Sequence, residues 1–498
     1  MRSILVLGSG SAGLIAALTL KRAMPAVSVR IVRSPEIGVI TVGESTTPIV
    51  PHHLTENLGI GRRRFYSMAE PTWKMGIKFL WGSRPYFNYS FEPQLDLRAS
   101  ALPRPYGYYC DDDFEYLNLH SALMTHDKAF GRQAKGGGPN IPPWHALHLE
   151  NPKLVKTLEA IARERGIEFM DAKVKGAERG PAGVAAVVLE DGRRLEADFY
   201  IDASGFRSEL LGRTLEEPYI SFSSSLFNDR AVVGGWERTD EPILPYTTAE
   251  TMDSGWCWRI DHEKIINRGY VYCSTAITDD EARAEFARKN PKAKVSDRLI
   301  KFQAGRYQRG WVENVMAVGN SCGFVEPIES TSLMVVCWQC QTFVDFLQHV
   351  GASATIRQLF NTALAATWDE IRDFLTLHFK LNTRLDTPYW RHCRGDADIS
   401  RLTTLLEFYE ENGPTGFARH YLQGVGSQFG VEGFLAILVG CQAPYRNRHQ
   451  ASDAERQFMC NHRARFKAQA LNGLDVKEAL AFIRHPGWRW CGEDQQKI

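Results

Sequence analysis

The chain has 498 residues, 44% of them apolar, and a formal net charge of +1. This length exceeds one average domain and predicts two or more lobes. The near-neutral charge argues against nucleic acid as the main partner. The ten cysteines are scattered along the chain, so we expect a reduced, cytoplasmic protein. Neither a targeting segment nor an apolar run of about 18 residues is visible, which predicts no membrane partner.

Residues 1–35 predict a βαβ unit. An apolar strand over residues 4–7 is followed by a helix-forming stretch over 14–24, and residues 27–32 alternate as a second strand. A GxGxxG pattern lies between the first strand and the helix, and at this place in a βαβ unit the pattern is typical of dinucleotide binding. We therefore expect a dinucleotide site formed by Gly8, Gly10, Ser11, Ala12 and Gly13.

Each glycine of this pattern has a physical task. Gly8 permits a tight turn, Gly10 lets the backbone approach a pyrophosphate, and Gly13 allows close packing of helix and strand. The helix N-terminus would offer unpaired N–H groups and the positive end of its dipole to the phosphates. The alternative is a glycine-rich turn that binds no ligand.

The end of the second strand departs from the usual dinucleotide pattern. An acidic residue often binds the adenosine ribose there. This chain has Arg33 and Ser34 at that place, with Glu36 two residues further on. Arg33 or Ser34 could contact the ribose or a phosphate, and the sequence does not decide between them.

Two later segments point to a flavin rather than to another dinucleotide. Residues 199–205 and 315–321 are each a buried strand that ends in a small-residue turn, the second one at Gly319. Both resemble the later FAD-contacting segments of Rossmann-type monooxygenases. Three such segments in the expected order predict an α/β, Rossmann-type FAD-binding monooxygenase fold. Its flavin contacts are expected mainly from residues 1–50, 195–210 and 315–335.

Residues 73–79 alternate between large apolar side chains and Lys74, Gly76 and Lys78. This is the period of a half-buried strand, and it places both lysines on one face. Two ordinary solvated lysines would be the default interpretation of an isolated strand.

Residues 323–331, Gly-Phe-Val-Glu-Pro-Ile-Glu-Ser-Thr, closely resemble a signature of the flavin-dependent halogenases of the tryptophan-halogenase type. The resemblance covers roughly residues 1–395. It also includes, in family order, residues 42–48, 73–79, 226–229, 254–260, 269–272, 305–306, 372–374, 378–379 and 386–391.

The resemblance implies that a lysine and a glutamate meet where a halogenating species is aimed at an indole carbon. The lysine is Lys74 rather than Lys78, because the family's lysine follows the aromatic residue at the place of Trp73. Glu329 is the glutamate, with Ser330 beside it, and Glu326 is structural or flavin-facing. Reduced FAD and O2 would give a flavin hydroperoxide, and halide attack on it would give hypohalous acid. Lys74 would hold that acid, and Glu329 would accept the proton lost by the ring.

Further roles also follow from the resemblance. Gly43, Glu44, Ser45, Gly319 and Pro327 are assigned to FAD, and the backbone at Thr331 and Ser332 is assigned to chloride or bromide. The family has glycine at the place of Ser332 and proline at the place of Asp261, the last residue of its tryptophan motif at 256–261. These two differences leave an aromatic hydroxylase open as an alternative. A catalytically silent flavin-binding protein is a second alternative.

The substrate-side residues differ from those of free-tryptophan halogenases. Tyr89 and Phe91 resemble the family's His-x-Phe element, with Tyr89 in place of histidine. The family's Tyr-Tyr pair is best matched by Gly433 and Phe434, and no Tyr-Tyr pair exists between residues 400 and 498. We expect an indole substrate held without a free-tryptophan clamp. It would be either a tryptophan within a peptide or a bulkier indole.

The sequence carries one flavin fingerprint and no second one for NAD(P)H, so a separate flavin reductase is expected to supply reduced FAD. A homodimer is suggested by resemblance alone. We expect a core over residues 1–390, with substrate-side strands and loops at 75–145 and 220–300. A helical capping region is expected over 391–498, with helices at 399–412 and 452–482. A buried helix is expected around the Cys-x-x-Cys of 337–340.

Overall fold

The computed structural model describes residues 1–34, 43–135, 137–422 and 428–490, so that Glu36 lies outside the described residues. The chain forms two compact units, each built from three separate segments. The first comprises Met1–Glu70, Leu149–Ser223 and Phe302–Asp369, and the second Pro71–His148, Ser224–Lys301 and Glu370–Ile498. Neither unit coincides with the division at residue 390 that we expected from the sequence.

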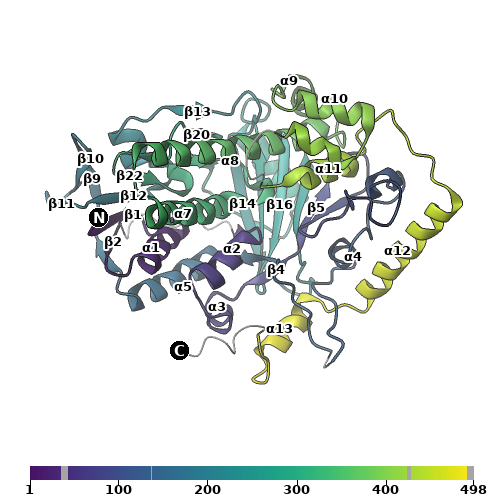
Figure 1. Ribbon diagram of the computed structural model, residues 1–498, viewed down its shortest axis with the longest axis horizontal. Coiled ribbons are helices and arrows are strands. Elements are labelled where there is room, and N and C mark those ends of the chain that lie inside the picture. Colours follow the sequence, from purple (N-terminus) through teal and green to yellow (C-terminus); the bar gives the residue numbers. More distant parts are fainter. Residues whose placement is uncertain (35–42, 136, 423–427, 491–498) are drawn as a thin grey trace. The chain divides into compact units, whose positions relative to one another are not determined.

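The core of the first unit is a six-stranded sheet in the order β21, β22, β12, β1, β2, β8. β1 runs parallel to β2 and to β12. The helices α1 (Ser11–Ala23), α5 (Asn151–Glu164) and α7 (Ser332–His349) pack together beside it (Figure 1). The strands are β1 (Ser3–Leu7), β2 (Ser28–Arg33), β8 (Glu168–Asp171), β12 (Phe199–Asp202), β21 (Trp311–Val312) and β22 (Val315–Ala317). The βαβ unit expected at the N-terminus is therefore confirmed.

Smaller sheets and helices complete the first unit. One sheet has the order β11-β10-β9 and another β13-β20-β23. Cys337 and Cys340 are buried within α7, which confirms the helix expected there. The remaining elements are β3 (Glu44–Ser45), α2 (Ile49–His52), α3 (Arg62–Ala69), β9 (Val174–Gly180), β10 (Gly183–Leu189), β11 (Arg194–Leu195), β13 (Tyr219–Ser221), β20 (Gly305–Tyr307) and β23 (Gly323–Phe324). α8 (Ala354–Leu381) contributes residues to both units.

The second unit is built around a mainly antiparallel sheet in the order β18-β14-β17-β16-β15-β5-β6, with β19 paired to β14. β14, β16 and β5, which belong to this sheet, are labelled in Figure 1. The strands are β5 (Gly76–Leu80), β6 (Phe87–Ser90), β14 (Arg230–Glu237), β15 (Thr247–Met252), β16 (Gly255–Asp261), β17 (Ile265–Tyr272), β18 (Lys294–Val295) and β19 (Ile300–Lys301). A further strand, β4 (Thr72–Lys74), pairs with β7 (Ala146–Leu149).

Helices make up the C-terminal part of the second unit. The segment expected to be helical at 452–482 holds two helices, α12 (Asp453–Leu471) and α13 (Val476–Arg484), separated by residues 472–475. The helices of this unit are α4 (Leu119–Thr125), α6 (Asp279–Lys289), α9 (Pro388–Asp396), α10 (Thr403–Asn412), α11 (Gly430–Gly440), α12 (Asp453–Leu471) and α13 (Val476–Arg484). Among the described residues, no helix is long and apolar enough to cross a membrane.

The single strand predicted over residues 73–79 is interrupted at Met75. The Met75 N–H donates to Pro245 O at 2.7 Å, and its carbonyl accepts from Phe91 N at 3.0 Å. These bonds continue the pairing of β5 with β15 and β6, whereas β4 pairs with β7, so the chain changes its strand partners between Lys74 and Met75. Lys74 and Lys78 therefore belong to two strands, and the expectation of one continuous strand with both lysines on one face is wrong.

Candidate active site

The glycine-rich turn after β1 has the geometry expected of a phosphate cradle. A Cβ built on Gly8, whose φ is +113°, would lie 2.3 Å from Ala203 O, and one built on Gly13 would lie 2.2 Å from Gly8 O. A Cβ on Gly10 would meet nothing within 4 Å. α1 begins directly after Gly10, which brings no capping side chain to the first N–H groups. Close packing at two glycines and open space at the third fit the pyrophosphate of a dinucleotide.

A polar network joins this helix start to the segment after β2. Ser11 Oγ donates to Asn151 Oδ1 at 3.0 Å, and Asn151 Nδ2 donates to Glu44 Oε1 at 3.0 Å. Burial raises the pKa of Glu44 to about 7. Two residues that we assigned to FAD are thus linked through Asn151. Asn151 was not assigned to the site from the sequence. Its position at the start of α5 is the one feature that could have pointed to it.

Two other assigned residues differ in their surroundings. Gly319, with φ +61°, approaches α1 so closely that a Cβ there would lie 2.8 Å from Ala12 Cβ. Arg33 instead binds Glu159 Oε2 at 2.5 Å and Asp171 Oδ1 at 2.7 Å. Hydrogen bonding to Asp171 raises the pKa of Arg33, while burial opposes the rise. Arg33 is therefore already held by protein carboxylates, and the ribose-binding residue stays a prediction.

The halogenase-like segment forms a tight turn ahead of α7. A short 3₁₀ helix over Pro327–Glu329 ends at Ser330, whose φ of 59° and ψ of 36° are left-handed. Ser330 Oγ donates to Ser45 Oγ at 2.9 Å, which ties the turn to β3. Glu329 and Thr331 are buried. Ser332 is the first residue of α7, so its backbone is helical and does not require glycine there.

Lys74 is fully buried at the end of β4. Its ammonium nitrogen lies 5.2 Å from the centroid of the Phe91 ring, within cation–π range. His148 pairs with Thr72 across the β4–β7 ladder, and its Nε2 lies 2.9 Å from Thr247 Oγ1. Burial and the nearby Lys74 charge hold the pKa of His148 well below its usual value. Lys74 belongs to the second unit and Glu329 to the first.

Lys78 has a structural environment of its own. Its ammonium donates to Tyr246 Oη at 2.8 Å and to Met124 O at 3.3 Å, and it lies 3.8 Å from Asp127 Oδ1. The ring of Tyr86 lies 4.9 Å away. Burial lowers the pKa of Lys78, although Asp127 opposes this. These contacts engage Lys78 with the protein, and the choice of Lys74 as the catalytic lysine stays a prediction.

The tryptophan motif of β16 is buried. Trp256 and Trp258 have ring centroids 6.1 Å apart, and a Cβ on Gly269 would lie 2.0 Å from the Trp258 ring. The Trp258 indole N–H is buried and has no hydrogen-bond partner among the residues that the structure describes. Asp261, which ends the motif, is fully buried and binds Arg238 at 2.7 Å and Arg259 at 2.8 Å. Its charge is therefore compensated within the fold.

The three residues assigned to the substrate lie in the second unit. Phe91 faces Lys74, and Tyr89 comes two residues earlier, with its ring centroid 6.1 Å from that of Phe374. The Phe374 ring stacks on Phe429 at 3.9 Å and meets Phe434 edge-on at 4.9 Å. The structure thus connects Phe434 to Tyr89 through Phe374, which sequence reasoning did not assign to the substrate.

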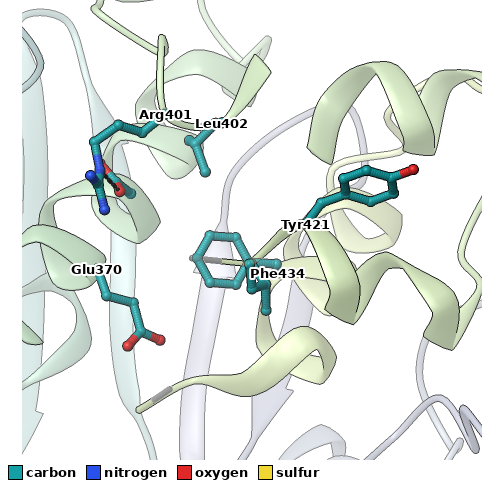
Figure 2. Close-up of a pocket in the computed structure, with 7 residues that line it drawn as sticks. Glu370, Arg401, Leu402, Tyr421 and Phe434 are labelled. Atoms are coloured by element: carbon teal, nitrogen blue, oxygen red, sulfur yellow. Dashed lines mark hydrogen bonds and ion pairs between the residues drawn. The ribbon is translucent and has the colours of Figure 1, made fainter. Parts of the chain in front are cut away.

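Phe434 lies at a hollow between α8, α10 and α11 (Figure 2). The cavity volume is about 20 Å³, roughly room for one water. Its lining residues are Glu370, Asp373, Arg401, Leu402, Tyr421, Leu422 and Phe434. Glu370 accepts backbone N–H groups of Gln428 and Phe429, which lie just ahead of α11, at 3.0 and 3.3 Å. The hollow as it stands is too small for an indole.

The sequence matches the family model described as tryptophan halogenase over residues 3–457. The chain belongs to the tryptophan halogenase family. It is therefore a flavin-dependent halogenase, and membership in this family implies FAD as its cofactor. The expected mixed α/β fold with a helical C-terminal region is confirmed.

Named halogenases of this family align over most of the chain. Tryptophan 7-halogenase RebH of Lentzea aerocolonigenes is 30% identical over 417 residues, 78% of each chain. Tryptophan 7-halogenase KtzQ of Kutzneria sp. (strain 744) is 31% identical over 443 residues, 83% of this chain and 82% of KtzQ. The crystal structure of MibH, a lanthipeptide tryptophan 5-halogenase, superposes with a TM-score of 0.89 at 37% identity, over 97% of this chain and 93% of MibH. These relatives act at different ring positions.

Proposed function

We propose that this halogenase acts on the indole ring of a tryptophan held within a peptide, with Lys74 and Glu329 as its catalytic residues. The observation that carries the proposal is the burial of Lys74 against Phe91, in the unit that also holds the ring contacts of Tyr89, Phe374 and Phe434. The similarity to MibH, whose substrate is a lanthipeptide, supports the choice of a peptide. A bulkier indole metabolite is the other substrate that the missing tyrosine pair allows.

Lys74 would control a diffusible oxidant. Reduced FAD, when bound, would activate O2, and O2 is the oxidant that turns chloride or bromide into hypohalous acid. The Lys74 ammonium donates a hydrogen bond to the oxygen of that acid, in a site where burial keeps bulk water away. The indole carbon then attacks the halogen, so that the C–halogen bond forms as the O–halogen bond breaks, and the departing hydroxide takes a proton from the Lys74 ammonium to leave as water. Lys74 regains a proton in exchange for the one that the ring releases. Lys74 thereby keeps the halogen beside one ring carbon.

Glu329 and the start of α7 would complete the reaction. The Glu329 carboxylate accepts the proton that the ring loses as it regains aromaticity. Thr331 and Ser332, at the N-terminus of an 18-residue helix, offer backbone N–H groups and a positive dipole end to the halide. Ser330 holds this turn to Ser45 of the segment assigned to FAD.

The other residues proposed for FAD are Gly8, Gly10, Ser11, Ala12, Gly13, Arg33, Ser34, Gly43, Glu44, Ser45, Gly319 and Pro327. They are supported by the open space at Gly10 and by the Ser11–Asn151–Glu44 network. A separate flavin reductase is proposed because the sequence has one dinucleotide fingerprint, and a homodimer is proposed from the resemblance alone.

The test is mass spectrometry of a substrate panel with FAD, a flavin reductase, NADH and either chloride or bromide. The panel holds free tryptophan, simple indoles and tryptophan-containing peptides. We expect a halogen isotope pattern with the highest kcat/KM on a peptide. Halogenation of free tryptophan or of simple indoles alone would contradict the peptide assignment. A gain of one oxygen that does not depend on halide would establish the hydroxylase instead.

A further inference from the structure

His148 lies on the same face of the β4–β7 ladder as Lys74. The ladder pairs Thr72 with His148 and Lys74 with Ala146. Because side chains in a strand alternate between its two faces, Lys74, Ala146 and His148 lie on one face. Ala146 places only a methyl group opposite Lys74. His148 is therefore the diagonal neighbour of Lys74 across the ladder, at a separation that a long side chain can span.

The imidazole of His148 uses one of its two ring nitrogens. The side chain is fully buried, and Nε2 lies 2.9 Å from Thr247 Oγ1. Nδ1 is buried as well and has no hydrogen-bond partner among the residues that the structure describes. Leaving a buried polar atom without a partner costs free energy, and folded proteins rarely do so. The packing of the fold alone therefore does not account for Nδ1.

The surroundings of His148 keep its ring neutral. Burial first, and then the neighbouring Lys74 and His262, hold the pKa of His148 well below its usual value, while the backbone of Asp261 opposes this. A neutral imidazole that donates its proton from one nitrogen accepts a hydrogen bond at the other. With Nε2–H donating to Thr247 Oγ1, Nδ1 is an uncharged acceptor beside a buried lysine.

We propose that His148 is a positioning residue whose Nδ1 accepts a hydrogen bond from the Lys74 ammonium in the working enzyme. This inference rests on the proposed function, in which Lys74 holds hypohalous acid. The structure places the ammonium at the Phe91 ring, and rotation about the end of the lysine side chain forms the bond. One fixed acceptor restricts a flexible lysine stem, and the other N–H groups stay available for the oxygen of the acid. Without this acceptor, more of the oxidant escapes.

The experiment compares His148→Asn with His148→Gln. The asparagine amide reaches the place of Nδ1 and the glutamine amide that of Nε2, so each variant keeps one polar position. Both are assayed with FAD, a flavin reductase, NADH and bromide, on a tryptophan-containing peptide or on indole, whichever the wild-type enzyme halogenates. The readout is the ratio of brominated product to hypobromous acid captured by an added phenol. We expect this ratio to stay within about threefold of wild type in His148→Asn and to fall about tenfold in His148→Gln, on the scale of one hydrogen bond to a charged group.

His53→Gln is the matched control, because His53 is also buried and its Nε2 also lies 2.9 Å from a threonine hydroxyl, that of Thr19. It is expected to lower the melting temperature and to leave the product ratio unchanged. A histidine kept only for its bond to Thr247 predicts the reverse order, with His148→Gln the better variant. That order, or equal ratios in the two variants, would overturn the inference. Product retained in Lys74→Met would overturn the proposed function instead, and the role of His148 with it.

The tautomer of His148 tests the same inference in the wild-type enzyme, even if neither variant folds. Nitrogen NMR of the labelled protein, with the His148 ring assigned, shows which nitrogen carries the proton. We expect the proton on Nε2 and none on Nδ1. A proton on Nδ1 would leave that atom no lone pair for Lys74 and would overturn the inference.

Discussion

The Thr72 hydroxyl donates a 2.6 Å hydrogen bond to the backbone oxygen of Asp261. Both residues are fully buried, and Thr72 lies two residues before Lys74 on β4. Asp261 is itself held by Arg238 and Arg259, and Arg238 also donates to His262 O at 2.7 Å. The end of β16 is therefore an anchor for the short strand that carries Lys74, the proposed catalytic lysine.

Thr72→Val should loosen this strand without changing the shape of the side chain. Losing one buried hydrogen bond costs about 1–3 kcal/mol, and we expect the yield of halogenated product per reduced FAD to fall about fivefold. Hypohalous acid that escapes Lys74 should then be captured by an added chemical trap. The measurement is the ratio of product to trapped oxidant.

Thr157→Val is the control for this variant, because Thr157 Oγ1 is also buried and donates to Lys153 O at 2.7 Å on α5. It should alter stability alone and leave the ratio of product to trapped oxidant unchanged. An unchanged ratio in Thr72→Val would show that the bond to Asp261 has no part in placing Lys74.

The raised pKa of the buried Glu44 carboxyl group predicts that the stability of the protein depends on pH. Its pKa is raised from 4.5 to about 7 by burial, so the folded protein binds this proton more tightly than the unfolded chain does. The contribution of Glu44 to stability therefore falls as pH rises from 4.5 to 7 and stays unfavourable above that range. Glu44→Gln, which keeps the acceptor for Asn151, should raise the melting temperature of the FAD-free protein at pH 8 but not at pH 4.5. The gain corresponds to at most about 3 kcal/mol. Equal effects of the substitution at both pH values would refute the buried-carboxyl explanation.

Ser332→Gly tests whether the side chain at the start of α7 interferes with the halide. Ser332 is helical and its backbone N–H is kept in the variant. The substitution should therefore change KM for chloride and for bromide by less than about threefold, which corresponds to a difference in binding free energy of under about 1 kcal/mol. KM values come from product formation at varied halide. A tenfold lower KM for chloride in the variant would mean that the serine side chain occupies halide space.

The glycine-rich turn could be predicted from the sequence because its conformation depends on residues that are close together in the chain. Gly8 and Gly13 make the close approaches for which glycine is needed, and Gly10 borders open space. The flanking strands and helix begin within a few residues of their expected places. The buried helix around Cys337 was likewise predictable from its apolar run.

Contacts between distant segments could not be predicted in the same way. Period-2 alternation runs through Met75, but the chain changes its strand partners there, since β4 pairs with β7 and β5 pairs with β15 and β6. Asn151 lies 107 residues from Glu44, and no local pattern marks the bond between them. Asp261 stands where the family motif has proline, and its ion pairs with Arg238 and Arg259 explain how its charge is accommodated. In each case tertiary partners decide the role.

The central claim, that Lys74 carries the halogen to the substrate, is tested most directly by comparing Lys74→Met with Lys78→Met. Both lysines lie in the same sequence segment, but Lys78 is bound to Tyr246 and Met124. The measurement is halogenated product by mass spectrometry, alongside the rate of flavin oxidation. We predict that Lys74→Met loses product about a hundredfold or more while flavin oxidation continues, and that Lys78→Met lowers the melting temperature but keeps product within about threefold. Product retained in Lys74→Met, or lost selectively in Lys78→Met, would contradict the mechanism.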